Sequence, residues 1–118
     1  MNEANHRLMK MKYKDVFPML LQKAIKKNRT AEEVYEITSW LTGYTKSELI
    51  SFLETDLLYY DFFMKSSKLN PNRHLITGKV CGVSLEEIMD PYVKEFRYLD
   101  KLIDELAKGK PLEKIKRT

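Results

Sequence analysis

The feature that most constrains the fold is a short pattern of helix-ending and helix-starting residues that occurs twice. Residues 37–49 read ITSWLTGYTKSEL, and residues 76–88 read ITGKVCGVSLEEI. In each copy a glycine, Gly43 or Gly82, follows a stretch with helical spacing of apolar residues. Glycine is common just after the last turn of a helix, because that residue often adopts a positive φ. Each copy therefore predicts that a helix ends at its glycine.

A helix start follows each glycine at the same distance. Thr45 precedes Glu48 by three residues, and Ser84 precedes Glu87 by three residues. This is the spacing of a capping box, in which the hydroxyl accepts a hydrogen bond from the glutamate N–H and the glutamate side chain bonds back to the cap. The sequence thus predicts two compact helix-turn-helix elbows.

Helical periodicity continues along most of the chain, and further caps mark where helices begin. Thr30 and Glu33 form another capping box, Asp56 can cap a helix, and Asn70 and Asp90 each stand directly before a proline, which is a strong helix start. The expected helices cover about 15–27, 31–42, 46–53, 57–65, 71–80, 91–106 and 111–116. We therefore predict an all-α fold, a single orthogonal bundle of five to seven short helices, with residues 1–118 in one domain and residues 1–12 loosely ordered.

The apolar positions of these helices define the expected core. It comprises Val16, Leu20, Ile37, Trp40, Leu41, Leu49, Phe52, Phe63, Ile76, Val80, Ile88, Phe96, Leu99 and Leu106. A chain of 118 residues can bury one such core without disulfides or metals.

Cysteine usage and hydropathy indicate the compartment. Cys81 is the single cysteine and cannot form an internal disulfide, and the sequence shows no signal peptide. The longest apolar run, 16–21, is far shorter than the roughly twenty residues that span a bilayer. We expect a cytoplasmic protein without a membrane association.

The chain lacks the usual signatures of catalysis. Its glycines, at 43, 78, 82 and 109, do not form a phosphate-binding loop, and its two histidines lie outside any metal-binding motif. We predict no catalytic residues, no metal and no cofactor, and we favour a protein that is not an enzyme without closing that question.

Charge is distributed in blocks of opposite sign. Residues 1–31 contain eight Lys or Arg and two acids, whereas residues 32–64 contain seven acids and one Lys. The basic block could form a surface for anions or nucleic acid. We favour the alternative, in which the basic helix lies against the acidic segment.

A polar cluster at 70–74 suggests a second possible site. Arg73 falls in the first turn of its expected helix, where the macrodipole favours anions over cations. Its guanidinium therefore needs an acidic partner, such as Glu95 or Asp100, or a bound anion. The candidate anion site consists of Asn72, Arg73, Arg97 and Lys101.

The preferred function is nevertheless an interaction module. Aromatic residues are concentrated in one short stretch, and Tyr59, Tyr60 and Phe62 could exceed what the core holds and form a surface for a partner protein or a homodimer. Anion or small-molecule binding, conceivably with enzymatic activity, is the alternative. Nucleic-acid binding through the two elbows ranks third, because the residues after each glycine are mainly acidic or neutral.

Several stretches together resemble a small bacterial family known only as domain of unknown function 2200. They are WLTGY at 40–44, LNPNRHLITGKVCGVSLEEI at 69–88 and FRYLDKLIDELAKGKPLEKI at 96–115, with His6-Arg7 and Val16-Phe17-Pro18 near the N-terminus. The resemblance implies an all-helical cytoplasmic fold and brings no activity, cofactor or partner. It modestly favours a shared polar site around Arg73 and Arg97.

Overall fold

The computed structural model describes residues 7, 9–80 and 82–117, and most of them are helical. The α-helices are α2 (Tyr13–Ile25), α3 (Ala31–Thr42), α4 (Lys46–Ser51), α5 (Tyr59–Met64), α6 (Pro91–Ala107) and α7 (Leu112–Ile115). Short 3-10 helices occupy Phe52–Glu54 (η1), Pro71–Leu75 (η2) and Leu85–Glu87 (η3), and two-residue strands occupy Lys79–Val80 (β1) and Val83–Ser84 (β2). The predicted helical fold is confirmed.

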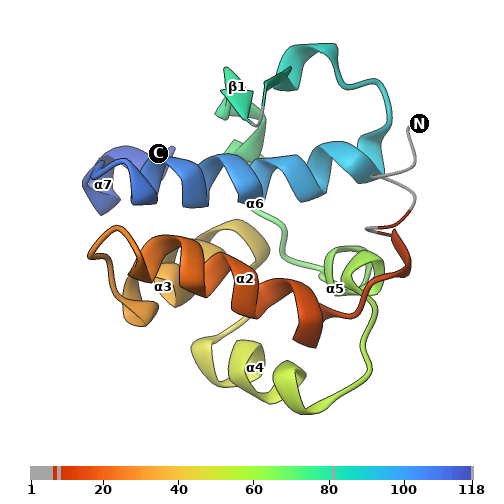
Figure 1. Ribbon diagram of the computed structural model, residues 1–118. Coiled ribbons are helices and arrows are strands. Elements are labelled where there is room, and N and C mark those ends of the chain that lie inside the picture. The colour runs from red at the N-terminus through yellow and green to blue at the C-terminus, as the bar shows by residue number, and fades with distance from the viewer. Residues whose placement is uncertain (1–6, 8, 81, 118) are drawn as a thin grey trace.

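Helix α6 is the longest element and separates two parts of the molecule. It begins as predicted, with the Asp90 carboxylate accepting hydrogen bonds from the N–H groups of Tyr92 and Val93. Figure 1 shows α2 and α3 on one side of α6 and the small hairpin on the other. Residues facing both sides are buried, which explains why α6 carries so many core positions: Val93, Phe96, Tyr98, Leu99, Leu102, Ile103 and Leu106.

A cluster of aromatic rings fills the core between α2, α5 and α6. Tyr13 stacks on Phe17 with ring centroids 4.9 Å apart and contacts Phe62 at 4.7 Å. Tyr59 stacks on Phe96 of α6 at 5.2 Å. Such ring pairs add to the stability that their buried area alone gives. The aromatic stretch of α5 is therefore used mainly to hold the bundle together.

The first glycine corner has the predicted geometry. Gly43 adopts φ 81° directly after α3. The Thr45 hydroxyl accepts from the Glu48 N–H at 3.1 Å, and the Thr45 N–H donates to the Glu48 carboxylate at 2.9 Å. The Thr30 and Glu33 capping box at the start of α3 is also present. Local sequence alone was sufficient to define this part of the chain.

The second glycine corner was predicted wrongly, because it joins two strands and not two helices. Gly82 has φ 79°, but it lies in the turn of an antiparallel hairpin in which β1 pairs with β2. Ser84 makes no capping box with Glu87; its hydroxyl donates to Glu86 at 2.6 Å, and the same carboxylate accepts from the Gly78 N–H at 3.0 Å. Glu86 thus fastens both ends of the hairpin, and the helix expected over 71–80 ends with η2.

Two smaller expectations also need correction. Asp56 caps no helix, since α5 begins at Tyr59; Asp56 instead pairs with Lys12 at 3.3 Å and Lys14 at 2.8 Å. These pairs join the basic block to the acidic block, as the charge pattern predicted. Of the expected core residues, Trp40, Phe52 and Ile88 are only partly buried.

Parts of the N-terminal prediction fall outside what the structure describes. Residues 1–6 and 8 are among these, so the expectation of loose order for 1–12 stays a prediction there, and Cys81 is also outside the described residues. Residues 11–13 are bonded to the 57–59 segment: Tyr13 N–H donates to Leu57 O, and Tyr59 N–H donates to Met11 O, both at 2.8 Å.

Candidate functional site

A groove of about 460 Å³ runs along the outer face of α3. Its lining from α3 consists of Glu32, Tyr35, Glu36, Ser39 and Trp40. These positions recur at i, i+3, i+4, i+7 and i+8, so they share one face of the helix. The opposite face of α3 is buried in the core, and the helix therefore has one face for stability and one that is open.

Two aromatic side chains form the apolar part of the groove. Tyr35 stacks on the buried ring of Phe17 with centroids 5.7 Å apart, and Trp40 packs against the core while remaining partly exposed. Between them, the Ser39 hydroxyl is occupied, because it donates to the Tyr44 carbonyl at 2.6 Å. The groove thus offers two partly exposed aromatic rings to another molecule.

Two ion pairs line the groove. Lys46, at the start of α4, pairs with Glu32, and Lys116, after α7, pairs with Glu36 at 2.6 Å. The Lys46 ammonium also lies 5.9 Å from the centroid of the Tyr35 ring. Exposed pairs of this kind contribute little stability, about 1 kcal/mol or less. A ligand could therefore open either pair at small cost and use the freed charges.

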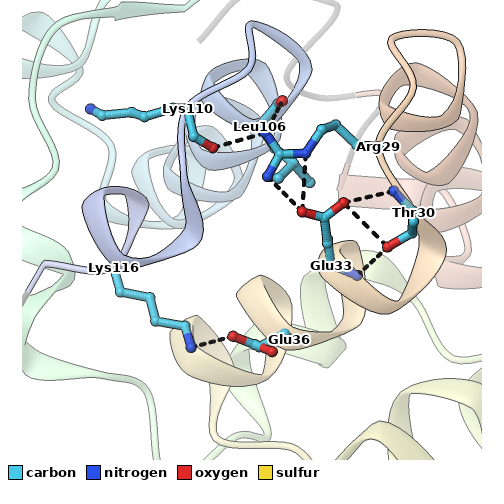
Figure 2. Close-up of polar contacts among 7 residues, drawn as sticks. All are labelled: Arg29, Thr30, Glu33, Glu36, Leu106, Lys110 and Lys116. Carbon is cyan, nitrogen blue, oxygen red and sulfur yellow. Dashed lines mark hydrogen bonds and ion pairs between the residues drawn. The ribbon is translucent and has the colours of Figure 1, made fainter.

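The wall that carries Lys116 is held in place by a second set of contacts. Figure 2 shows Arg29 between the start of α3 and the end of α6, with the Glu36 and Lys116 pair further along α3. Arg29 donates to Glu33 at 2.6 Å and to the Lys110 carbonyl at 2.9 Å. Further on, Arg117 donates to both carboxylate oxygens of Glu105, at 2.6 and 2.8 Å. The groove is thus bordered by a fixed C-terminal segment.

The positively charged residues of the predicted anion site bind acceptor groups of the protein itself. Arg73 pairs with Glu95 at 3.0 Å, which confirms one of the two acidic partners suggested by the sequence. Arg97 pairs with Asp100 at 3.1 Å, and Lys101 donates to the Lys79 carbonyl at 3.0 Å. Anion binding by these residues together with Asn72, which is exposed, stays a prediction.

The predicted aromatic surface is wrong for two of its three residues. Tyr59 is 1% exposed and Phe62 is fully buried, because positions 59, 62 and 63 share the face of α5 that meets the core. Tyr60 points away and is partly exposed, with its ring 5.3 Å from that of Tyr92. The rings that seemed surplus are therefore needed inside the bundle.

Sequence reasoning missed two groups whose pKa is raised by burial, the hydroxyl of Tyr59 and the carboxyl of Asp100 in α6. The Tyr59 hydroxyl is buried and has no hydrogen-bond partner among the described residues. Burial raises the pKa of Tyr59 well above its usual value, and the charge of Asp100 raises it further. Burial also raises the pKa of Asp100, although Arg97 opposes this shift. The sequence suggested Asp100 as a partner of Arg73; the signal that was overlooked is that position 100 adjoins the buried residues 96, 99 and 103.

Neither a metal-binding cluster nor a membrane-spanning helix is found among the residues that the structure describes. Within the described part of the chain, no three His, Cys, Asp or Glu residues gather closely enough to hold a metal ion. Over the same residues, every helix is too short or too polar to cross a bilayer.

The sequence and the fold are both similar to those of known proteins that are uncharacterized. A family model described as "Uncharacterized protein conserved in bacteria (DUF2200)" matches residues 7–117. A crystal structure of the uncharacterized protein SP1917 is 45% identical in sequence and superposes with a TM-score of 0.90, covering 97% of this chain and 93% of that one. No curated protein matches the chain.

Proposed function

The chain belongs to the bacterial DUF2200 family of uncharacterized proteins. We propose that it is a non-enzymatic interaction module that binds a segment of another protein in the groove over α3. The observation that carries the proposal is that Tyr35, Trp40 and two ion pairs line one groove over the open face of α3.

The chemistry of the groove supports a protein segment as the ligand. Tyr and Trp are enriched among the residues that dominate binding energy at protein interfaces, because they bury a large area at a low entropic cost. Glu32 and Glu36 balance Lys46 and Lys116, so the groove has no net charge to attract a small anion or cation. A segment with an apolar side chain flanked by polar groups matches a groove lined by two aromatic rings and two ion pairs.

The single tryptophan of the chain provides a direct test. Because Trp40 lines the groove, a bound segment should change its fluorescence. We would select peptides from a random display library against the wild-type protein and titrate the enriched ones. The proposal expects that binding shifts the Trp40 emission and that Tyr35→Ala weakens binding by about tenfold or more.

A matched control is available at the other aromatic surface. Tyr92→Ala removes a ring that is 42% exposed and lies outside the groove, so it should leave binding unchanged. The proposal fails if no peptide is enriched, or if the enriched peptides bind Tyr35→Ala and wild type equally. Light scattering over a concentration series checks self-association; a dimer that Tyr35→Ala converts to a monomer would identify a second copy as the partner.

A further inference from the structure

A second concave surface lies on α2, away from the groove over α3. It is a hollow of about 490 Å³ lined by Pro18, Met19, Gln22, Lys23, Lys26 and Lys27. Met19, Gln22, Lys23 and Lys26 recur at i, i+3, i+4 and i+7, so they form one continuous face of the helix. Met19 is 55% exposed although it is a large apolar residue. The face is therefore apolar in its floor and remains uncovered.

The charged residues that line this hollow are all lysines. Lys23 is held by Asp104 of α6 at 3.5 Å, and Asp104 is shared with Lys108 at 3.0 Å. Lys26 and Lys27 make no ion pair with any described residue, and the hollow has no acidic lining. The basic block at the N-terminus thus divides into two parts: Lys12 and Lys14 pair with Asp56, whereas the two lysines at the end of α2 stay available.

We propose that this hollow docks an acidic segment of a partner protein, which places a bulky apolar side chain on Met19 and carboxylates on Lys26 and Lys27. Methionine suits such a floor, because its flexible thioether side chain adapts to different apolar shapes. The lysine stems can cover the apolar side chain while their ammonium groups reach the flanking carboxylates.

The same observations disfavour two other occupants. A symmetric contact between two copies would bring the same lysines of both chains together, and like charges repel. An anionic lipid surface is met by protruding apolar side chains between basic ones, whereas this surface is concave. Both occupants are nevertheless outcomes that the experiment separates.

The probe is a labelled synthetic peptide of about twelve residues with a central Phe-Leu pair between glutamates, measured by fluorescence anisotropy. A second peptide replaces every glutamate by glutamine. The expected result is binding of the acidic peptide that weakens as salt rises, with no binding of the glutamine peptide. Lys26→Glu together with Lys27→Glu should weaken binding by about tenfold or more, and Met19→Gln should weaken it as well.

The control is a double variant of two other exposed lysines, Lys65→Glu with Lys68→Glu. It changes the net charge identically, since two substitutions of 2 units each take +4 to 0. Equal loss in both double variants would show unspecific attraction and overturn the proposal, as would absence of binding at low salt. Stronger binding to phosphatidylserine vesicles, or self-association that only Lys26→Glu with Lys27→Glu abolishes, would replace it by a lipid surface or a second copy.

Discussion

The Nε atom of Arg73 lies 3.0 Å from both carboxylate oxygens of Glu95, and this contact joins η2 to the N-terminal part of α6. Arg73 also donates through Nη1 to the Asn70 carbonyl at 2.9 Å. An arginine in the first turn of a helix is electrostatically unfavourable, and these contacts explain it. Glu95 is 9% exposed, so the guanidinium provides the counter-charge that makes its burial possible.

Removal of Arg73 should therefore destabilise the fold. Arg73→Ala leaves a mostly buried carboxylate without its partner, and we expect a loss of about 2 kcal/mol in the free energy of unfolding, between the values for exposed and fully buried pairs. Chemical denaturation measures it. The double variant Arg73→Met with Glu95→Leu should recover much of the loss, because no unpaired charge remains. Lys65→Ala, an exposed residue, is the control; an Arg73→Ala protein as stable as this control would contradict the pairing.

Gly43 and Gly82 offer a matched comparison, because their φ angles are 81° and 79°. A Cβ at position 43 would lie 2.4 Å from the Lys68 Cβ and 2.6 Å from the Lys68 carbonyl oxygen, whereas a Cβ at position 82 meets nothing within 4 Å. Gly82→Ala should cost about 1 kcal/mol for the left-handed backbone alone. Gly43→Ala should cost clearly more, because the backbone of residue 68 must move. Equal losses in denaturation would contradict the close approach.

These two glycines also show what local sequence can and cannot predict. The end of α3 and the start of α4 depend on neighbouring residues, so the pattern around Gly43 was sufficient. The similar pattern around Gly82 forms two strands instead. Val80 is buried in the core, and the Glu86 carboxylate accepts a hydrogen bond from the N–H of Gly78, eight residues earlier. A contact at that separation does not follow from a capping pattern, which considers only the next turn.

The candidate site was predictable only in part for a similar reason. The i, i+3, i+4 spacing of α3 assigned Trp40 to the core, and its side chain does pack against the core while staying partly exposed. The groove that Trp40 also lines could not be predicted, because Lys46 and Lys116 reach it from other elements, whose positions the pattern of α3 does not give. In α5, composition indicated too many rings, but the choice of which ring stays outside follows from the path of α2 past it.

The hydrogen bonds that Glu86 accepts in the hairpin are expected to depend on pH. The Ser84 hydroxyl and the Gly78 N–H lower its pKa to about 2. A carboxyl whose pKa is lowered on folding stabilises the fold above its unfolded value of 4.5, and this contribution is lost as the pH falls toward 2. NMR titration should show the Gly78 amide shifting with the Glu86 carboxyl. Glu86→Gln should perturb the hairpin and Glu87→Gln should not; the reverse result would restore the capping box predicted from sequence.

Asp100 should show the opposite pH dependence. Burial raises its pKa in the folded protein above the ordinary 3.8 of the unfolded chain. At a pH between the unfolded and the folded pKa, the folded protein therefore binds more protons than the unfolded one. Stability then falls as the pH rises through this window. Relative to Asp100→Asn, the wild type should gain stability as the pH is lowered from neutral toward 4. Carboxyl-carbon NMR gives the pKa directly, and a value below 3.8 would contradict the burial of this group.

Arg29 is the residue whose exact side-chain shape should matter most for the end of α6. Its Nη1 donates to the carbonyls of Lys110 and Leu106 while Nε and Nη2 donate to Glu33 (Figure 2). The last carbonyls of a helix lack partners within the helix, and a planar guanidinium can serve them and a carboxylate at once. Arg29→Lys keeps the charge but offers one ammonium group for acceptors on two sides. We expect a loss of about 1–2 kcal/mol and faster hydrogen exchange in the last turn of α6.

The same substitution should change an ionisable neighbour. The hydrogen bond from Arg29 is the main cause of the lowered pKa of Glu33, so Arg29→Lys should raise that pKa toward its ordinary value of 4.5. Lys108→Ala is the control. It also removes a positive charge at this end of α6, but the Lys108 side chain is largely exposed. If Arg29→Lys left both the exchange rates and the Glu33 titration as in this control, the contact would be incidental. If both change together, the segment that borders the α3 groove depends on one guanidinium for its position.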